Sequence, residues 1–126
     1  MQKSGKFLAH TRKCYVITFE TETWDEAGAR CSEKYNGTLA TISDEQTMII
    51  VKKMKHKDDQ IWIGASRTST SAPWTWQNRS PWSYSNWVPG EPDTTDTAAR
   101  IYKNKGSWGL WAGAPKYAQF HYLCQF

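Results

Sequence analysis

The feature that most constrains this chain is a long stretch, residues 65–90, whose apolar residues follow neither the helical nor the strand period. The stretch is rich in Ser, Thr and Pro and also carries several Trp residues. Segments this long without secondary structure are uncommon in compact domains unless they carry function. Each buried Trp removes a large apolar area from water, at roughly 25 cal/mol per Å². We therefore predict an ordered, functional loop on a small folded domain, with at most short strands around residues 74–76.

Length and composition predict a single folded unit. A chain of 126 residues, of which 39% are hydrophobic, suits one core and leaves no room for two. We predict one domain over residues 1–126, with residues 1–13 as a basic lead-in and the long loop at about residues 65–97. No run of about 18 apolar residues occurs, so we expect no membrane span in this chain. The polar start lacks the apolar stretch of a signal peptide, so a secreted protein would contain this chain as a mature or excised domain.

The charge permits an anionic partner but does not require one. The net charge is +4 and the pI is near 9.0. The basic run at residues 52–57 is typical of a solvated helix end, and a site for a sulfated glycan is the alternative. We exclude nucleic acid as a partner because the aromatic residues do not interleave with the basic run, as they do in stacking platforms.

Two helices and several strands are predicted from local signals. Residues 23–26 form a capping-box pattern with Thr23 at the N-cap, and the helix that follows runs to about Tyr35, where Asn36-Gly37 ends it. Residues 43–46 form a second capping box, which opens a helix to about Met54. The buried face of that helix is predicted as Thr47, Ile50, Val51 and Met54. Strands are predicted at residues 14–19, 39–42, 61–64, 99–103, 107–111 and 121–126. This mixture predicts an α+β domain.

The cysteines are Cys14, Cys31 and Cys124. They form no CxxC motif, and no His lies at a metal-ligand spacing from them, which excludes a zinc site. An odd number means that at least one thiol stays free, pairs between chains or has lost its partner.

A further pattern is an ordered set of short motifs that runs along the whole chain. The set is Trp24-x-Glu26-Ala27, Cys31, Gly37-Thr38-Leu39-Ala40-Thr41-Ile42, Glu45, Trp62-Ile63-Gly64-Ala65, Trp74-x-Trp76, Tyr84-Ser85-Asn86-Trp87, Glu91-Pro92-Asp93, Trp111 and Tyr122-Leu123-Cys124. Any one of these motifs is weak, but the ordered set with these spacings is highly specific. From about Cys14 to Phe126 the chain resembles the C-type lectin-like domain.

The resemblance implies a double-loop fold, with two helices, two small antiparallel sheets and a long ligand-binding loop. It implies that the N- and C-terminal strands pair and that Cys31 forms a disulfide with Cys124. Such a bond would contribute up to about 4–5 kcal/mol in the chain-entropy model. Because the bond requires an oxidising compartment, we expect a secreted protein or the extracellular part of a cell-surface protein.

Two further disulfides of similar domains are missing. The partner expected for Cys14 would lie near Lys3, and no Cys occurs there. Cys14 is therefore expected to be an unpaired thiol, with an interchain disulfide that links a dimer as the alternative. The staple of the long loop would join positions near Ala98 and Lys116, and neither is Cys. We expect packing of the Trp cluster to replace the staple.

The resemblance also implies a calcium ion in the long loop. Sugar-binding members hold it with oxygen ligands that come partly from a tripeptide with a central cis proline. The residues that match this half of the site are Glu91, Pro92, Asp93 and Asp96, and the metal ligands among them would be Glu91, Asp93 and Asp96. The other half would read Trp-Asn-Asp, but here it reads Trp111-Ala112-Gly113. Because Ala112 and Gly113 replace the expected ligands, we predict weak or absent calcium dependence.

We predict an extracellular recognition module that binds a glycan through the long-loop surface. The alternative is a calcium-independent domain that binds a cell-surface protein and no sugar. The candidate ligand-binding residues are Trp82, Trp87, Glu91, Pro92, Asp93, Asp96, Trp108 and Trp111. We predict no enzymatic activity and assign no catalytic residue, because no nucleophile–base pairing emerges and the His residues show no triad spacing.

Two tripeptides fit the pattern of an N-glycosylation acceptor. They are Asn36-Gly37-Thr38 and Asn78-Arg79-Ser80. The second is followed by Pro81, which makes it the poorer acceptor.

Overall fold

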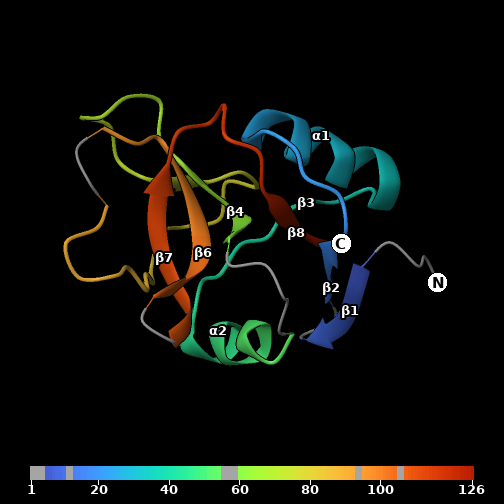
Figure 1. Ribbon diagram of the computed structural model, residues 1–126. Coiled ribbons are helices and arrows are strands. Elements are labelled where there is room, and N and C mark those ends of the chain that lie inside the picture. Colours follow the sequence, from blue (N-terminus) through green and yellow to red (C-terminus); the bar gives the residue numbers. More distant parts are fainter. Residues whose placement is uncertain (1–4, 11–12, 55–59, 93–94, 105–106) are drawn as a thin grey trace.

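The computed structural model of the protein describes residues 5–10, 13–54, 60–92, 95–104 and 107–126. Within these ranges the chain forms two helices and eight strands (Figure 1). The helices are α1 (Trp24–Tyr35) and α2 (Glu45–Lys52). The strands are β1 (Gly5–His10), β2 (Lys13–Thr18), β3 (Thr38–Leu39), β4 (Gln60–Ser66), β5 (Thr75–Trp76), β6 (Ala98–Asn104), β7 (Ser107–Ala114) and β8 (His121–Gln125). The predicted α+β class is confirmed.

The helix ends agree with the sequence signals in position but not in every contact. Thr23 is the extended N-cap of α1, yet its side chain makes no capping hydrogen bond, so the predicted capping box is wrong there. Asn36 ends α1 in the left-handed region, with φ of 56°. The N-cap of α2 is Asp44 instead of Ser43, because the Asp44 carboxylate accepts a 2.7 Å hydrogen bond from the backbone N–H of Thr47.

The buried face of α2 differs from the prediction at one position. Met48 is 1% exposed and Ile50 is only half-buried. The physical reason is the indole of Trp111, whose Nε1–H lies 3.3 Å from the Met48 sulfur and seats that side chain in the core. Among the described residues, neither helix is long and apolar enough to cross a membrane.

The strands follow one path, β1-β2-β8-β4-β6-β7, with β3 beside β8 and β5 beside β4. Pairing of β2 with β8, for example Val16 opposite Cys124, confirms that the N- and C-terminal strands are neighbours. The expected fold is confirmed, with one pairing that was not predicted. Strand β8 also pairs with β4, in parallel, so the two antiparallel groups join into a mixed sheet.

Strand β1 is an element that the sequence did not predict. Residues 5–10, which read as part of a basic lead-in, pair with β2 along its whole length, from Gly5 opposite Thr18 to His10 opposite Lys13. The strand therefore extends the edge of the sheet beyond the first predicted strand.

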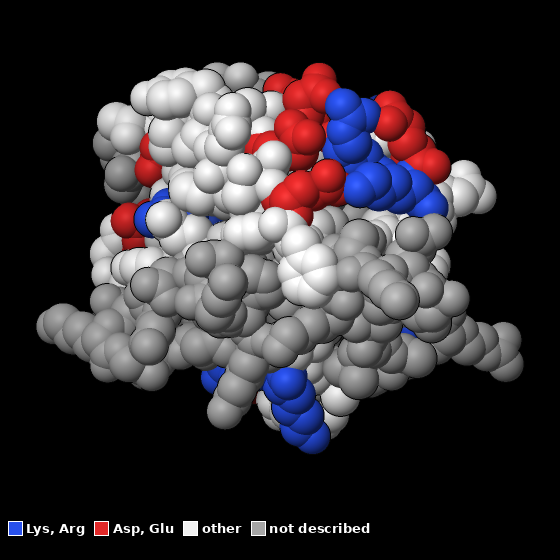
Figure 2. Space-filling model, turned by 45° about the vertical axis from the view of Figure 1, so that its right-hand side comes forward, with Lys and Arg blue, Asp and Glu red and all other residues white. Residues whose placement is uncertain are grey.

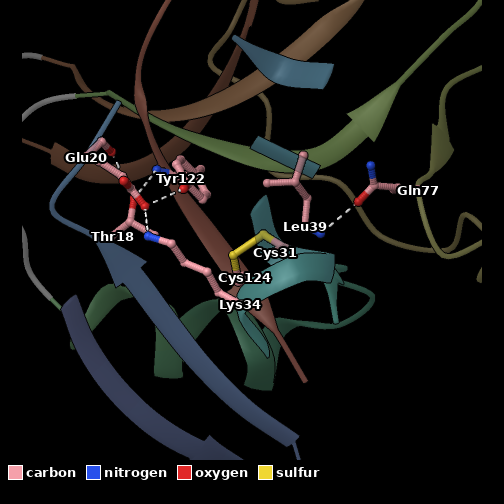
Figure 3. The surroundings of a disulfide bond; sticks show 8 residues. All are labelled: Thr18, Glu20, Cys31, Lys34, Leu39, Gln77, Tyr122 and Cys124. Atoms are coloured by element: carbon pink, nitrogen blue, oxygen red, sulfur yellow. Dashed lines mark hydrogen bonds and ion pairs between the residues drawn. A yellow bond between two sulfur atoms is a disulfide. The ribbon is translucent and has the colours of Figure 1, made fainter. Parts of the chain in front are cut away.

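The disulfide lies beneath α1 and joins it to β8 (Figure 3). Cys31 and Cys124 are 93 residues apart in sequence and 5.5 Å apart between their Cα atoms, and both are fully buried. This confirms the implied pairing. Near the bond, the Glu20 carboxylate accepts hydrogen bonds from the Lys34 ammonium and, at 2.9 Å, from the Tyr122 hydroxyl (Figure 3).

Two clusters of buried side chains make up the core. One surrounds the disulfide and includes Trp24 and Trp62. The other extends from α2 to the long loop and includes Trp76 and Trp111. The long loop therefore rests on its own part of the core, at the end of the molecule opposite the C-terminal end of α1 (Figure 1).

Candidate ligand-binding surface

Arg67 holds together the two ends of the long loop. Its backbone N–H donates to the carbonyl of Thr97 at 2.9 Å, and its Nε donates to the carbonyl of Asp96 at 2.9 Å. Its guanidinium also donates to the Thr70 carbonyl at 3.0 Å and lies 4.8 Å from the ring centroid of Trp74. Only 8% of Arg67 is exposed. The loop is thus closed at its base by hydrogen bonds, close to Ala98, where the resemblance implies a disulfide.

Trp111 on β7 is the centre of the aromatic cluster. It is fully buried, and other rings meet it edge-on. The centroid distances are 5.5 Å to Trp76, 6.1 Å to Trp82, 5.9 Å to Tyr84 and 5.7 Å to Trp87. Since the indole N–H of Trp111 points to Met48, the cluster connects the long loop to α2.

Backbone hydrogen bonds fasten the later part of the loop to β7. The Trp111 N–H donates to the Asn86 carbonyl at 2.8 Å, and the Val88 N–H donates to the Trp111 carbonyl at 2.8 Å. The Asn86 side chain adds a 3.0 Å bond to the carbonyl of Gly109. Residues 86–88 therefore run beside β7 almost as an extra strand, which positions Trp87.

Trp82 and Trp87 are a stacked pair among the partly buried rings of the cluster, which also include Trp74 and Tyr84. Both are partly buried, and their rings are near-parallel, with an interplanar angle of 24° and centroids 6.5 Å apart. Trp74 packs on Trp87 at 5.0 Å, and Trp76 stacks beneath Trp82 at 4.7 Å. The buried indole of Trp76 and the partly buried indole of Trp74 thus hold the pair in place.

The Glu91–Pro92 peptide bond is cis, as the resemblance implies. The Glu91 carboxylate accepts a 2.9 Å hydrogen bond from the backbone N–H of Gly113. A Cβ on Gly113 would lie 2.8 Å from the Cβ of Asp96, so the absence of a side chain at 113 lets the loop approach β7 closely. Glu91 and Asp96 therefore converge on one residue of β7.

Arg100 on β6 brings a positive charge to the same place. Its guanidinium donates to the carbonyl of Gly113 and lies over the rings of Tyr102, at 4.9 Å, and Phe120, at 5.6 Å. Burial lowers the pKa of the guanidinium, while Tyr102 and the carboxylates of Glu91 and Asp96 act to raise it. The carboxylates of Glu91 and Asp96 thus interact electrostatically with the guanidinium of Arg100.

The sequence as a whole matches one family. Residues 20–126 fit the Lectin C-type domain. The chain belongs to the C-type lectin family.

Curated relatives of this C-type lectin include longer proteins. It is 28% identical over 120 residues to human C-type lectin domain family 17, member A, a match that covers 94% of this chain and 31% of that protein. It is 35% identical over 97 residues to C-type lectin lectoxin-Lio3 of Erythrolamprus poecilogyrus, which covers 71% of this chain and 58% of that protein. The chain therefore spans less than two thirds of the length of either relative.

Solved structures confirm the fold. The C-type lectin domain of murine dendritic cell inhibitory receptor 2, in complex with N-glycan, superposes with a TM-score of 0.88 at 20% identity, covering 100% of this chain and 98% of that one. A calcium-independent type II antifreeze protein superposes with a TM-score of 0.85 at 23% identity, covering 100% of this chain and 93% of that one.

The described residues of this C-type lectin do not fit the calcium ion that such domains often bind. A calcium site needs six to eight oxygen ligands. Here one carboxylate oxygen of Glu91 already accepts a hydrogen bond from Gly113. Neither Ala112 nor Gly113 has a side-chain oxygen. The positive charge at this place comes instead from the guanidinium of Arg100. Among the described residues, no group of three or more His, Cys, Asp or Glu side chains could hold a metal ion.

The expected site residues fall into three groups. Trp82 and Trp87 form the outer aromatic pair, while Glu91 and Asp96 converge at Gly113, two residues after the central Trp111 in chain order. Trp111 itself is fully buried, and its indole packs inside the domain beneath the outer pair. The third group is Asp93 and the side chain of Trp108, which lie outside the described residues.

Sequence reasoning missed Arg67 and Arg100. One signal was available for Arg100, a single cation at the centre of a strand whose neighbours Ala98, Ala99 and Ile101 are apolar. Arg67 follows β4 at the start of the long loop and carries no comparable pattern, because its partners come from residues on both sides of the loop.

Proposed function

We propose that this C-type lectin domain is an extracellular recognition module that binds glycans through the long-loop surface and does not need calcium to do so. The observation that carries the proposal is the outer pair of near-parallel, partly buried indoles, Trp82 and Trp87, fixed on a second layer of buried aromatic rings.

A surface of this kind suits a sugar ring. The faces of a pyranose are apolar at their C–H groups, and its hydroxyls are polar at the rim. Rigid indoles provide apolar contact at low entropic cost, and nearby polar groups fix orientation. Exposed Ser83 and Ser85 lie between Trp82 and Trp87 in sequence; the Ser83 hydroxyl donates to the Ser43 carbonyl at 3.2 Å, and Ser85 offers a hydroxyl to such a rim.

Calcium independence is supported by the Arg100 arrangement. In a calcium-dependent site, the ion draws the loop and its neighbouring strand together through shared oxygen ligands. Here the Glu91 carboxylate accepts a hydrogen bond from Gly113, which joins the loop to β7, while Arg100 of the adjacent strand β6 donates to the carbonyl of the same residue and places its positive charge there. The calcium-independent antifreeze protein indicates that this fold can operate without the ion. We assign no catalytic role to this surface.

The test is a glycan array probed twice with one protein preparation, once with calcium and once with a chelator. We expect the same glycans to be bound in both. Trp82→Ala should remove binding, while Tyr117→Ala should leave it unchanged, because this highly exposed aromatic side chain lies beside Thr95 and Thr97 and is not part of the aromatic cluster. Binding that disappears with the chelator would contradict calcium independence.

The alternative, a protein-binding domain with no sugar activity, makes a different prediction. No glycan would be retained, and a cell-surface protein would be captured by the wild type but not by Trp82→Ala. That result would overturn the glycan proposal and keep the same surface as the binding site.

A further inference from the structure

The two candidate glycosylation tripeptides lie in very different surroundings. Asn36 follows the last residue of α1 and is exposed. Asn78 follows β5 and is half-buried. From sequence, only Pro81 makes Asn78 a poorer acceptor than Asn36. In the structure, the two side chains also differ in the contacts that they make.

The side chain of Asn36 is not needed to end the helix. The backbone N–H of Asn36 donates to the Ser32 carbonyl at 3.0 Å, and that of Gly37 donates to the Cys31 carbonyl at 3.2 Å. The neighbouring side chains of Ser32 and Glu33 are exposed as well. A glycan on the Asn36 amide would therefore extend into solvent without displacing a core contact.

Asn78 is used by the fold. Its side-chain oxygen accepts a 2.7 Å hydrogen bond from the Thr41 hydroxyl and a 3.0 Å bond from the backbone N–H of Ser80. The side chain lines a cavity of about 140 Å³ together with Tyr15 and Gln125. A glycan is attached to the amide nitrogen, so on Asn78 it would start from a half-buried side chain that these two bonds hold against the fold.

Packing alone accounts for the central residue of the exposed tripeptide. A Cβ on Gly37 would lie 2.0 Å from the carbonyl oxygen of Gln125, so β8 requires glycine there. Asn is also among the residues that tolerate the left-handed conformation. These constraints explain why Asn36 and Gly37 occur here, and they do not exclude glycosylation of Asn36. The exposure of the Asn36 side chain is therefore the observation that supports its modification.

We propose that Asn36 is an N-linked glycosylation site when the chain passes through a eukaryotic secretory pathway, and that Asn78 remains unmodified. The inference rests on the extracellular location in the proposed function. Figure 1 places the end of α1 and the long loop at opposite ends of the molecule. A glycan on Asn36 would therefore leave the Trp82–Trp87 surface open.

The test is secretion of the full chain from cultured mammalian cells behind a cleavable signal, followed by intact-mass measurement before and after peptide N-glycosidase. We expect a single glycan, with Asn36 converted to Asp by the enzyme. Asn36→Asp should abolish the glycan while retaining a residue that tolerates the left-handed region. Thr38→Ser should retain it, and Asn78→Asp should leave its amount unchanged.

Unmodified Asn36 in secreted, folded protein, or a glycan on Asn78, would overturn the proposal. A melting curve of each variant separates a lost acceptor from a lost fold. The mass readout does not depend on ligand binding, so failure of the proposed glycan recognition leaves this result interpretable. We also expect Asn36→Asp to bind the array as the wild type does.

Discussion

The region around the disulfide and the region around the long loop are stabilised by opposite means. The disulfide region, formed by α1, β2 and β8, has a covalent link and an exposed network in which Arg30 pairs with Glu22, Glu26 and Glu33. Figure 2 shows acidic and basic side chains interleaved on one part of the visible face. The loop region has no cross-link among its described residues. Buried cations and stacked indoles hold it instead.

The difference shows how a long loop stays ordered without its staple. Exposed ion pairs contribute about 0–1 kcal/mol each to stability, so the disulfide is the main stabilising link of the disulfide region. In the loop region Arg67 is buried, Arg100 and Glu91 are partly buried, and all three are hydrogen-bonded, so losing a partner is costly. We therefore expect reduction to weaken the disulfide region and single substitutions to weaken the loop region. The following predictions run from the largest expected effect to the smallest.

Trp111→Ala should have the largest effect. It removes a fully buried indole that four other rings contact, and substitutions of this type cost about 3–5 kcal/mol. Urea unfolding measures the change in free energy. The matched variant Trp82→Ala, at a partly exposed position of the same cluster, should cost clearly less. An equal or larger loss for Trp82→Ala would contradict Trp111 as the centre of the loop region.

Replacing both Cys31 and Cys124 by Ala should lower the free energy of unfolding by about 2–4 kcal/mol. Near-ultraviolet circular dichroism in the absence of denaturant should keep the signal of the stacked indoles, because that cluster lies in the other part of the core. Cys14→Ala is the control, since this half-buried thiol is free. Loss of the indole signal in the double variant would show that the two regions are not independent.

Arg100→Met should cost about 1–3 kcal/mol, because it leaves the Gly113 carbonyl without its donor and the Glu91 carboxylate beside an apolar side chain. Thermal melting with and without added calcium tests whether Arg100 takes the place of a calcium ion. A ligand that binds only the folded state raises the melting temperature. We expect calcium to change neither the wild type nor the variant, and stabilisation of the wild type would refute the assignment of Arg100.

Glu20→Gln should have the smallest effect, at most about 1 kcal/mol, the ceiling for an exposed pair. The hydrogen bond from Lys34, assisted by Tyr122, lowers the pKa of Glu20 below its ordinary value of 4.5. Its contribution is therefore fully present above pH 4.5 and is lost as the pH falls through the folded-state pKa. Melting temperatures from pH 3 to pH 7 should show the wild type and the variant converging at the acid end, whereas a difference independent of pH would contradict the carboxylate's role.

Much of the fold was predictable because its signals are local. The helix end at Asn36-Gly37 and the short apolar runs of the central strands β4 and β8 depend on near neighbours in sequence. Strand β1 was not predictable in this way, because residues 5–10 become a strand only through pairing with β2. The parallel contact between β4 and β8 was missed for the same reason, since Ile61 and His121 are far apart in sequence.

The candidate site was predictable in position but not in chemistry. The resemblance located the Glu91–Pro92 turn and the altered residues Ala112 and Gly113. It did not predict that a cation would come from β6, because Arg residues are mostly exposed unless paired, and pairing is invisible in one sequence. Whether a Trp is buried or exposed also depends on distant partners, as the contrast between Trp111 and Trp82 shows.

The order β1-β2-β8 has a consequence for assembly in multivalent arrays. Phe126 exchanges backbone hydrogen bonds with Cys14 on β2, which places the end of the chain beside the N-terminal hairpin. In Figure 1, β1, the first described strand, and the C-terminus lie on the side away from the long loop. Copies attached to a scaffold through either end would all turn their loop faces outward, so a weak single contact could gain avidity through effective concentration.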